Sequence, residues 1–217
     1  LKSRIILLGP PASGKGTLAA MLSEHFHLPT GSTGAMLRQE RAAGSALGRE
    51  ADLYTSQGKL FPDSVALRVV ESWLQQHGVR FILDGFPRTV GQAQAFDRIL
   101  ARRAVEVECV ISLQLSREEI ERRVLSRLTC SACGATFSTL LHPVSEGGAC
   151  PKCGGRLVRR QDDTLEALEQ RLQEHHESSE PVEEYYHVQG KVTELQAARR
   201  SEEIFAQAIR LIAEGVS

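Results

Sequence analysis

The sequence predicts an α/β fold in which a parallel sheet is covered on both faces by helices. Short apolar runs alternate along the chain with amphipathic helical patterns, and the first run ends at a turn that contains glycine and proline. The chain of 217 residues is long enough to bury a substantial core. It is also short enough that we expect one domain with insertions rather than two independent domains.

Four runs predict the strands. They cover residues 4–11, 79–86, 107–115 and 191–197. The first is rich in leucine and β-branched residues and ends at one glycine and two prolines, as expected where a buried strand meets a turn. Because helical patterns separate the runs, the strands are expected to be parallel.

Six helical patterns accompany the strands. They cover residues 15–26, 64–78, 91–103, 116–128, 162–176 and 201–215. In the first pattern, Leu18, Leu22 and Phe26 are spaced four apart and share one helical face. The last pattern predicts a capped final helix with Gly215 at its end.

Two of these patterns carry more detailed expectations. The pattern at 116–128 opens with a capping box of Ser116 and Glu119. Its apolar stripe consists of Ile120, Val124 and Leu128, and Arg123 and Arg127 share an adjacent face. In the pattern at 162–176 the inward residues are expected to be Leu165, Leu168 and Leu172. Pro181 is expected to end this helix.

The charge balance excludes broad classes of partner. Lys plus Arg number 26 and Asp plus Glu 27, so the net charge of −1 provides no global field that attracts nucleic acid or an anionic membrane. No apolar run approaches the ~18 residues of a membrane span, and the first residues do not resemble a secretory signal. We expect a soluble, cytoplasmic protein whose anion sites are local.

The turn after the first strand carries the pattern "GPPASGKGT", residues 9–17. It fits the glycine-rich phosphate loop, in which backbone N–H groups converge on phosphate oxygens at the start of a helix. Lys15 can reach the β- and γ-phosphates, and Thr17 is the hydroxyl candidate for the metal or the α-phosphate. The alternative is an ordinary glycine-rich turn, which the strand before and the helix after disfavour. The pattern predicts a nucleoside triphosphate with Mg²⁺.

Two later segments offer further phosphate ligands. Thr33 and Arg38 could hold a second phosphate, although a Ser/Thr/Gly turn before a helix is commonly only an N-cap. Asp84, at the end of a buried strand, could hold Mg²⁺ through water, and Arg88 could pair with phosphate. The alternative is a structural Asp that caps the next turn.

Phosphoryl transfer between two nucleotides requires several arginines from different segments to converge. The candidates are Arg38, Arg88, Arg123, Arg127, Arg160 and Arg171. Each of them taken alone is more typically a solvated surface charge.

Four cysteines form two CxxC pairs, Cys130/Cys133 and Cys150/Cys153. Their spacing predicts a four-thiolate Zn²⁺ site, and Gly134 and Gly154 follow the two knuckles. Four protein ligands leave no open position, so the zinc should be structural. A nucleic-acid-binding ribbon is disfavoured because residues 134–149 contain no Lys or Arg. A redox role is disfavoured because such motifs usually open a helix.

We therefore interpret the cysteine segment as a metal clip that holds a polar segment too short to bury its own core. Cys109 lies in an apolar run and is expected to be a small buried hydrophobe. His142 could be a spare ligand, but a loop histidine is the preferred interpretation.

Together these stretches resemble the adenylate kinase family. The resemblance rests on the phosphate loop, "STGAMLR", "GKL" at 58–60, "DGFPRT" with Gln92, "RRVLSR", "RRQDD" and Arg171, which occur in the family's order along nearly the whole chain. It implies a P-loop nucleoside monophosphate kinase with a parallel five-stranded sheet flanked by helices and two small insertions. The core would comprise residues 1–29, 62–122 and 162–217, the monophosphate-binding excursion 30–61, and the zinc-binding lid 123–161.

The resemblance also implies the site residues. The ATP site would consist of Gly9, Ala12, Ser13, Gly14, Lys15, Gly16, Thr17, Arg123, Arg127 and Arg199. The AMP site would consist of Thr33, Gly34, Arg38, Lys59, Leu60, Gly85, Arg88, Gln92, Arg160 and Arg171. The residues of catalysis would be Lys15, Asp84, Arg88, Arg123, Arg160 and Arg171. Asp84 would orient the water shell of Mg²⁺, and Asp162 and Asp163 resemble the family's acidic pair at the lid hinge.

Four positions depart from the family pattern. Ala12 and Ser13 stand where the family usually has Gly and a variable residue, Ala35 replaces a usual Asp, and Leu128 stands where a second Arg is common. Ala12 would tighten the loop if that position requires a positive φ. Because Lys15, Asp84 and the arginines are retained, we interpret these changes as tuning.

The expected function is reversible transfer of a phosphoryl group from Mg-ATP to AMP by a monomer. The alternatives are another monophosphate acceptor or a GTP donor on the same fold, and a catalytically silent nucleotide-binding module.

Overall fold

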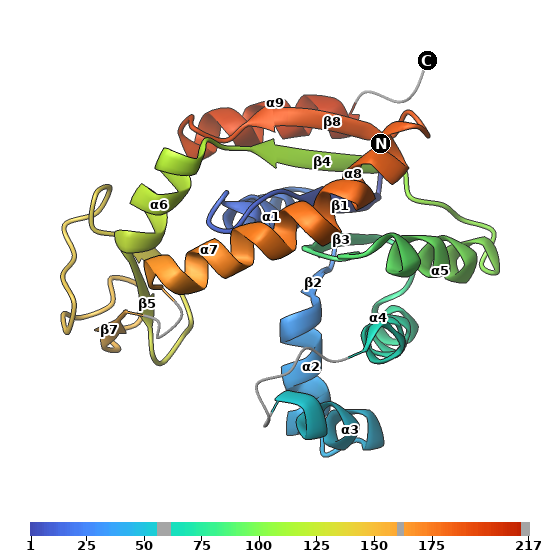
Figure 1. The fold of residues 1–217 in the computed structure, drawn as a ribbon, viewed down its shortest axis with the longest axis horizontal. Helices are drawn as coiled ribbons and strands as arrows, with labels where there is room; N and C mark the ends of the chain where they lie inside the picture. The colour runs from blue at the N-terminus through green and yellow to red at the C-terminus, as the bar shows by residue number, and fades with distance from the viewer. Residues whose placement is uncertain (56–61, 160–162, 214–217) are drawn as a thin grey trace.

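The computed structural model describes residues 1–55, 62–159 and 163–213, and it confirms the predicted α/β architecture (Figure 1). One five-stranded sheet is parallel throughout. Its spatial order is β2 (Thr30–Ser32), β3 (Phe81–Asp84), β1 (Arg4–Leu8), β4 (Cys109–Gln114) and β8 (Val192–Gln196). Because β1 is central, the phosphate loop that follows it emerges between the carboxyl ends of β3 and β4.

Helices cover both faces of this sheet, as predicted. One face packs against α1 (Lys15–Phe26) and α9 (Ser201–Ala213). The other packs against α4 (Asp63–His77), α5 (Val90–Ala101) and α8 (Glu180–His187). Within β1, Ile5 and Leu7 belong to the first cluster, whereas Ile6 and Leu8 belong to the second. The alternation follows from the period of two along a strand.

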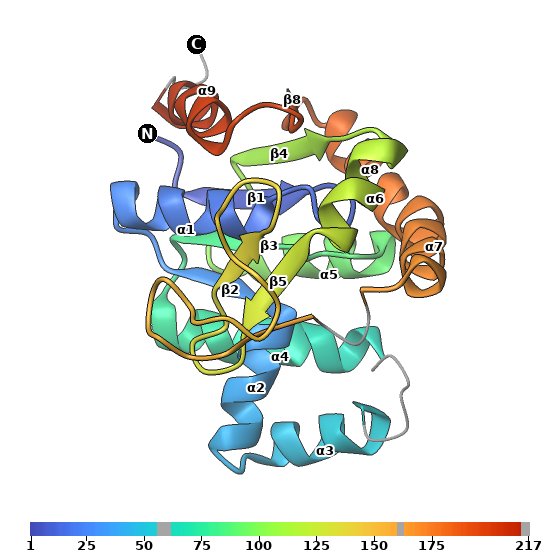
Figure 2. The same cartoon turned by 90° about the vertical axis from the view of Figure 1, so that its left-hand side faces the viewer.

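A smaller antiparallel sheet lies outside the core. It contains β5 (Arg127–Cys130) between β6 (Thr136–Ser138) and β7 (Leu157–Val158), and α6 (Arg117–Leu125) leads into it. Figure 2 turns this sheet towards the viewer. The helices α2 (Thr33–Ala42) and α3 (Ala46–Thr55) project separately, at the bottom of Figure 1.

The predicted helix at 116–128 is wrong at its carboxyl end, where the last three residues are not helical. The Ser116 hydroxyl accepts a hydrogen bond from the Glu119 N–H at 3.3 Å, as expected for the cap, but α6 ends at Leu125. Arg127 and Leu128 lie in β5 and do not continue the helical faces. Pairing of β5 with β6 and β7 decides the backbone there, and Leu128 is fully buried between these strands.

The expectations for residues 162–176 also need correction. Leu165 is 57% exposed, because it is the first residue of α7 (Leu165–Glu174), directly after the Thr164 N-cap. Pro181 does not end the helical path. A π-helical turn (His175–Ser179) follows α7, and Pro181 then lies in the first turn of α8, where its missing N–H costs little. Leu168 is buried as predicted.

The predicted excursion at 30–61 begins with β2, an edge strand of the core sheet that the sequence patterns did not indicate. The alternative N-cap is present one residue earlier than Thr33, since the Ser32 hydroxyl accepts the Ala35 N–H at 3.3 Å. Lys59 and Leu60 of this segment lie outside the described residues, as do Arg160, Asp162 and Gly215.

Among the helices in the described parts of the chain, none combines the length and the apolar character needed to cross a membrane.

Candidate functional site

The phosphate loop connects β1 to α1 and requires unusual backbone angles. Gly9 has φ +133°, and a Cβ at this position would lie 2.5 Å from the carbonyl oxygen of Leu113, so only glycine fits. Gly14 has φ +95° and caps α1. Ala12 has φ +58°, the positive angle considered for it, at a cost of about 1–2 kcal/mol. Its methyl group packs against the cluster of Ile120, Val124 and Leu168.

Lys15 folds back over this loop. Its Nζ donates to the carbonyl oxygens of Gly9 and Pro10, both at 2.8 Å, and to Ser13 Oγ at 3.3 Å. Burial lowers the pKa of Lys15 to about 8, and although Asp84 opposes this shift, Arg88 and Arg171 add to it. The ammonium group therefore sits among fixed cations, in a place where an anion is strongly favoured.

Asp84, at the carboxyl end of β3, faces the start of α1. A Cβ on Gly16 would lie 3.4 Å from its Oδ2. Burial raises the pKa of Asp84, although Lys15 and Arg88 act in the opposite direction. Asp84 and Arg88 from the end of β3 and its following loop, Lys15 from the start of α1 and Arg171 from α7 thus influence one another's charge. This is the convergence from different segments that the sequence predicted for part of the arginine set.

Arg123, at the end of α6, reaches the phosphate loop. Its guanidinium donates to the Ser13 carbonyl at 3.4 Å and to the Ala197 carbonyl at 2.5 Å. Glu119 accepts from its Nε at 2.9 Å and holds the side chain in this direction. The end of α6, which leads into the small sheet, is therefore linked both to the phosphate loop and to the end of β8.

Arg127 pairs with the fully buried carboxylate of Asp163 through two hydrogen bonds, one of them from Nε at 2.9 Å. Arg171 Nη1 lies 4.0 Å from the same carboxylate. Asp163 thus gathers two of the predicted phosphate ligands at the junction of β5 and α7.

The predicted acceptor site has its own hydrogen-bond network. Thr33 and Gln92 are buried. The Gln92 amide accepts from the Arg88 N–H at 2.8 Å through Oε1 and donates to Asp63 Oδ1 at 2.6 Å through Nε2. Thr89, the N-cap of α5, donates its hydroxyl to Asp63 Oδ2 at 2.7 Å. These contacts link the start of α4 to the loop after β3.

Two predicted ligands remain apart from this cluster. Arg38 is exposed on α2, with its Nη1 3.5 Å from where a Cβ on Gly34 would lie. Arg199 is exposed and pairs with Glu203 at 3.9 Å. Neither contacts Lys15 or Asp84 among the residues that the structure describes, so their assigned roles remain predictions.

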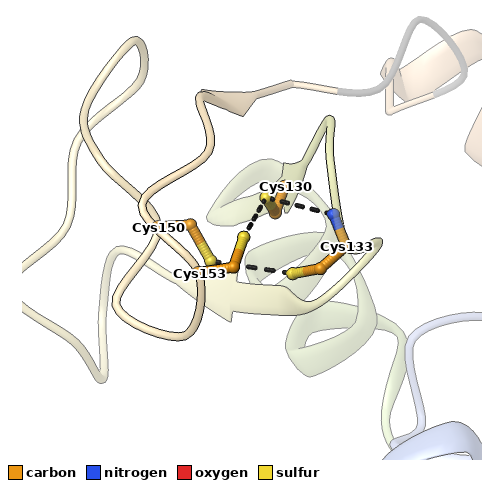
Figure 3. A group of neighbouring side chains, drawn as sticks. All are labelled: Cys130, Cys133, Cys150 and Cys153. Atoms are coloured by element: carbon orange, nitrogen blue, oxygen red, sulfur yellow. Dashed lines mark hydrogen bonds between the residues drawn. The ribbon is translucent and has the colours of Figure 1, made fainter.

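The four cysteines of the two CxxC pairs converge at one point in the small sheet (Figure 3). The sulfur atoms of Cys130 and Cys153 are 3.5 Å apart, those of Cys133 and Cys150 are 3.8 Å apart, and all four lie within 4.8 Å of one another. Four sulfurs at ~2.3 Å from a tetrahedral Zn²⁺ would be separated by about 3.8 Å. The donor set therefore fits zinc. His142 is not part of it and contacts the Ser138 carbonyl at 3.2 Å, as expected for a loop histidine.

Local backbone geometry supports the cysteine cluster. Hydrogen bonds from the backbone N–H groups of Cys133 and Ala132 lower the pKa of Cys130 to about 6. At the neighbouring Cys153, a hydrogen bond from the Gly155 backbone lowers the pKa, but the thiols of Cys133 and Cys130 outweigh it and raise the pKa overall. Gly134 and Gly154 have φ +72° and +77°, as expected for the two knuckles. Gly155, which the motif reasoning passed over, is required by packing, because a Cβ there would lie 2.9 Å from Cys130 Sγ.

The expectation that this segment buries no core of its own is wrong. Leu128, Cys130, Cys150 and Leu157 form a small buried cluster, with Phe137 and Val144 packed against it. Two of the four members are cysteines of the candidate metal set, so the apolar core and the candidate metal site share these residues. Elsewhere, Cys109 is buried in β4 as predicted, and burial raises the pKa of its thiol.

Two site residues escaped the sequence reasoning. Asp63 contacts Gln92 across 29 positions, a relation that only the packing of α4 against α5 reveals. His175 lies in the π-helical turn and lines a pocket together with Gly9 and Pro10, while burial and Lys15 lower its pKa. The available signal was position, since Asp63 directly precedes the helical pattern at 64–78 and His175 lies near the end of the pattern at 162–176.

The chain is similar to known proteins along most of its length. The family model described as adenylate kinase matches residues 7–191. A curated adenylate kinase of Alkaliphilus oremlandii is 39% identical over 208 residues, which cover 95% of this chain and 96% of the relative. That of Archaeoglobus fulgidus is 38% identical over 205 residues, 94% of each chain. That of Desulfitobacterium hafniense is 40% identical over 194 residues, 88% of this chain and 89% of the relative.

Proposed function

The chain belongs to the adenylate kinase family, and on this ground we propose that it transfers the γ-phosphoryl group of Mg-ATP reversibly to AMP, giving two ADP. The observation that carries the proposal is the convergence of Lys15, Asp84, Arg88 and Arg171 at the phosphate loop. Three cations around a single carboxylate suit a ligand with many negative oxygens.

On the donor side, the backbone N–H groups of residues 9–17 cradle the triphosphate at the start of α1. Lys15 exchanges its loop carbonyls for the β- and γ-phosphates. Arg123 and Arg127 close over ATP from the lid, and the backbone near Arg199 contacts the adenine.

On the acceptor side, the base of AMP meets the amide of Gln92. Its phosphate meets Thr33, Arg38 and Arg88, with Gly34 and Gly85 lining the site. We assign Lys59 and Leu60, which lie outside the described residues, to the same AMP site on the basis of the family resemblance. Support comes from the burial of Thr33 and Gln92 beside the loop that carries Arg88.

Catalysis requires positioning and charge neutralisation, with no covalent enzyme intermediate and no obligatory general base. Arg88, Arg123, Arg160 and Arg171 neutralise the phosphoryl group in transit. Lid closure excludes water, which otherwise competes with AMP as acceptor. Asp84 would orient the water shell of an Mg²⁺ ion bound together with ATP, and the ion would supply further neutralisation of phosphate charge.

The lid is proposed to hold a structural Zn²⁺ through Cys130, Cys133, Cys150 and Cys153. The metal would join the two knuckles of a sheet whose core is too small to be stable alone. Since free thiols at this spacing require reducing conditions, we also propose a cytoplasmic setting. We propose a monomer, because one chain supplies donor, acceptor and lid residues.

A coupled assay of ADP formation from ATP and AMP tests the function. Initial rates with UMP and CMP as acceptors, and with GTP as donor, test the alternatives on the same fold. Faster ADP production with AMP and ATP than with any other pair supports the proposal. Nucleotide binding without ADP production would instead establish a silent module, for which the departures at Ala12 and Ala35 are the relevant changes.

A further inference from the structure

A carboxylate outside the predicted site controls the buried amide of Gln92. Asp63 is the first residue of α4, and Gln92 lies in the first turn of α5. Asp63 Oδ1 accepts from Gln92 Nε2 at 2.6 Å, and Oδ2 accepts from the Thr89 hydroxyl at 2.7 Å. Both carboxylate oxygens are therefore fixed by neighbours in or beside α5.

The chemistry of these partners allows only one orientation of the amide. The Arg88 N–H can only donate, so it requires Oε1 of Gln92. The Asp63 carboxylate can only accept when ionised, so it requires Nε2. If the amide were rotated by 180°, its N–H₂ group would face the Arg88 backbone N–H, and its oxygen would face the Asp63 carboxylate. Both hydrogen bonds would then be lost. Gln92 retains one N–H and one lone pair for a ligand, in a fixed order.

The fixed positions of this donor and this acceptor allow Gln92 to distinguish between purine bases. A 6-aminopurine presents a donor at its exocyclic nitrogen beside an acceptor at N1, whereas a 6-oxopurine presents an acceptor beside a donor. A freely turning glutamine is complementary to both edges, but a locked one is complementary to only one of them. We propose that Asp63 is a positioning residue that sets the base selectivity of the monophosphate site in favour of 6-aminopurines. This inference rests on the proposed function, which assigns Gln92 to the AMP site.

A merely structural role for Asp63 makes a different prediction. An acidic residue in the first turn of α4 also interacts favourably with the helix dipole. If that were its whole role, its removal would lower stability without changing the choice of base. Selectivity, rather than total activity, is therefore the decisive readout.

The test compares AMP with IMP, which differ only in the 6-amino and 6-oxo groups. For Asp63→Ala we expect the ratio of kcat/KM for AMP to kcat/KM for IMP to fall about tenfold, the size expected for losing one charge-assisted hydrogen bond to the reading group. The KM for ATP should not change. Asp63→Asn keeps an acceptor for Gln92 and a donor for Thr89, so it should retain most of the selectivity. Ser64→Ala, at the neighbouring exposed position, is the matched control.

A Gln92→Ala background tests whether Asp63 acts through Gln92. In Gln92→Ala, the additional change Asp63→Ala should leave the AMP to IMP ratio unaltered, because Asp63 acts through Gln92. An unchanged ratio in Asp63→Ala alone, in protein that turns over ATP and AMP, would overturn the inference and leave the proposed function intact. Wild-type protein that forms no ADP from ATP and AMP would instead overturn the proposed function.

Discussion

Raising the pH above 8 should weaken ATP binding, because Lys15 loses its charge in the nucleotide-free enzyme. Burial lowers its pKa from 10.5 to about 8, with Arg88 and Arg171 adding to the effect. A bound triphosphate places several negative charges beside the ammonium group and favours its charged form, which returns the pKa towards the ordinary value. Binding must therefore take up a proton wherever Lys15 is neutral before binding and charged afterwards.

The two pKa values set the size of the effect. With about 8 in the free enzyme and about 10.5 in the complex, linkage predicts uptake of about 0.1 proton per ATP at pH 7 and about 0.9 at pH 9. The dissociation constant for ATP should rise about tenfold between these pH values. The sign follows from the lower pKa of the free state, so affinity falls between pH 8 and 10.5 and is nearly flat below pH 7.

Calorimetric titration with Mg-ATP in two buffers of different ionisation enthalpy measures the proton uptake directly. Lys15→Arg is the control, because a guanidinium stays charged at pH 9 and should show no uptake, although its planar shape should weaken binding overall. A dissociation constant that does not change from pH 7 to 9, together with no proton uptake by the wild-type protein, would refute the reasoning.

Three further predictions concern the arginine cluster and the metal clip. In the coupled assay, Arg88→Ala should lower kcat by a factor of about 10³ to 10⁵. The control Arg80→Ala, at an exposed arginine before β3, should leave kcat unchanged. Near-normal turnover of Arg88→Ala would contradict the argument that arginines converge on the phosphates. Cys150→Ser should lower both Tm and zinc content but largely preserve turnover at low temperature. The control Cys109→Ala should keep its zinc. Activity that disappeared in proportion to zinc in folded protein would show that the metal has more than a structural role. Gly155→Ala should weaken zinc binding in a chelator competition, because its methyl group would lie 2.7 Å from Ala132 Cβ. If the variant bound zinc as tightly as the wild-type protein, the small sheet would have to relax around the added methyl group.

The core sheet and the phosphate loop could be predicted because their signals are local. A run such as "RIILLGPP" contains both the buried strand and its end, and the helix at 15–26 was predicted with the bounds that the structure has. The prediction for 116–128 failed at the end of the helix, because nothing local distinguishes Leu128 on a helical stripe from Leu128 on a strand. Its conformation depends on β6 and β7, which pair with it from later in the chain.

The candidate site also contains residues that local signals identify and residues that only the packing of distant segments reveals. Motifs identified Lys15, Asp84 and the four cysteines, since in each case the residue types and the spacing carry the chemistry. The role of Asp63 depends on two helix starts being placed side by side, which no spacing encodes. The small apolar core of the lid was missed for a related reason, because the cysteines counted as ligands also serve as buried apolar residues.

Internal acceptors explain why the cations of the site do not destabilise it before a substrate binds. Lys15 is bound to two loop carbonyls, and Arg127 is bound to the buried Asp163, so neither charge is buried without a partner. An unpaired buried cation would cost several kcal/mol. Phosphate oxygens must replace these internal acceptors, so each new hydrogen bond is partly an exchange and contributes less than its gross strength. On the proposed mechanism, the surplus comes from the additional negative charge and from closure of the proposed lid. Affinity would then depend on the same motion that excludes water and later releases ADP.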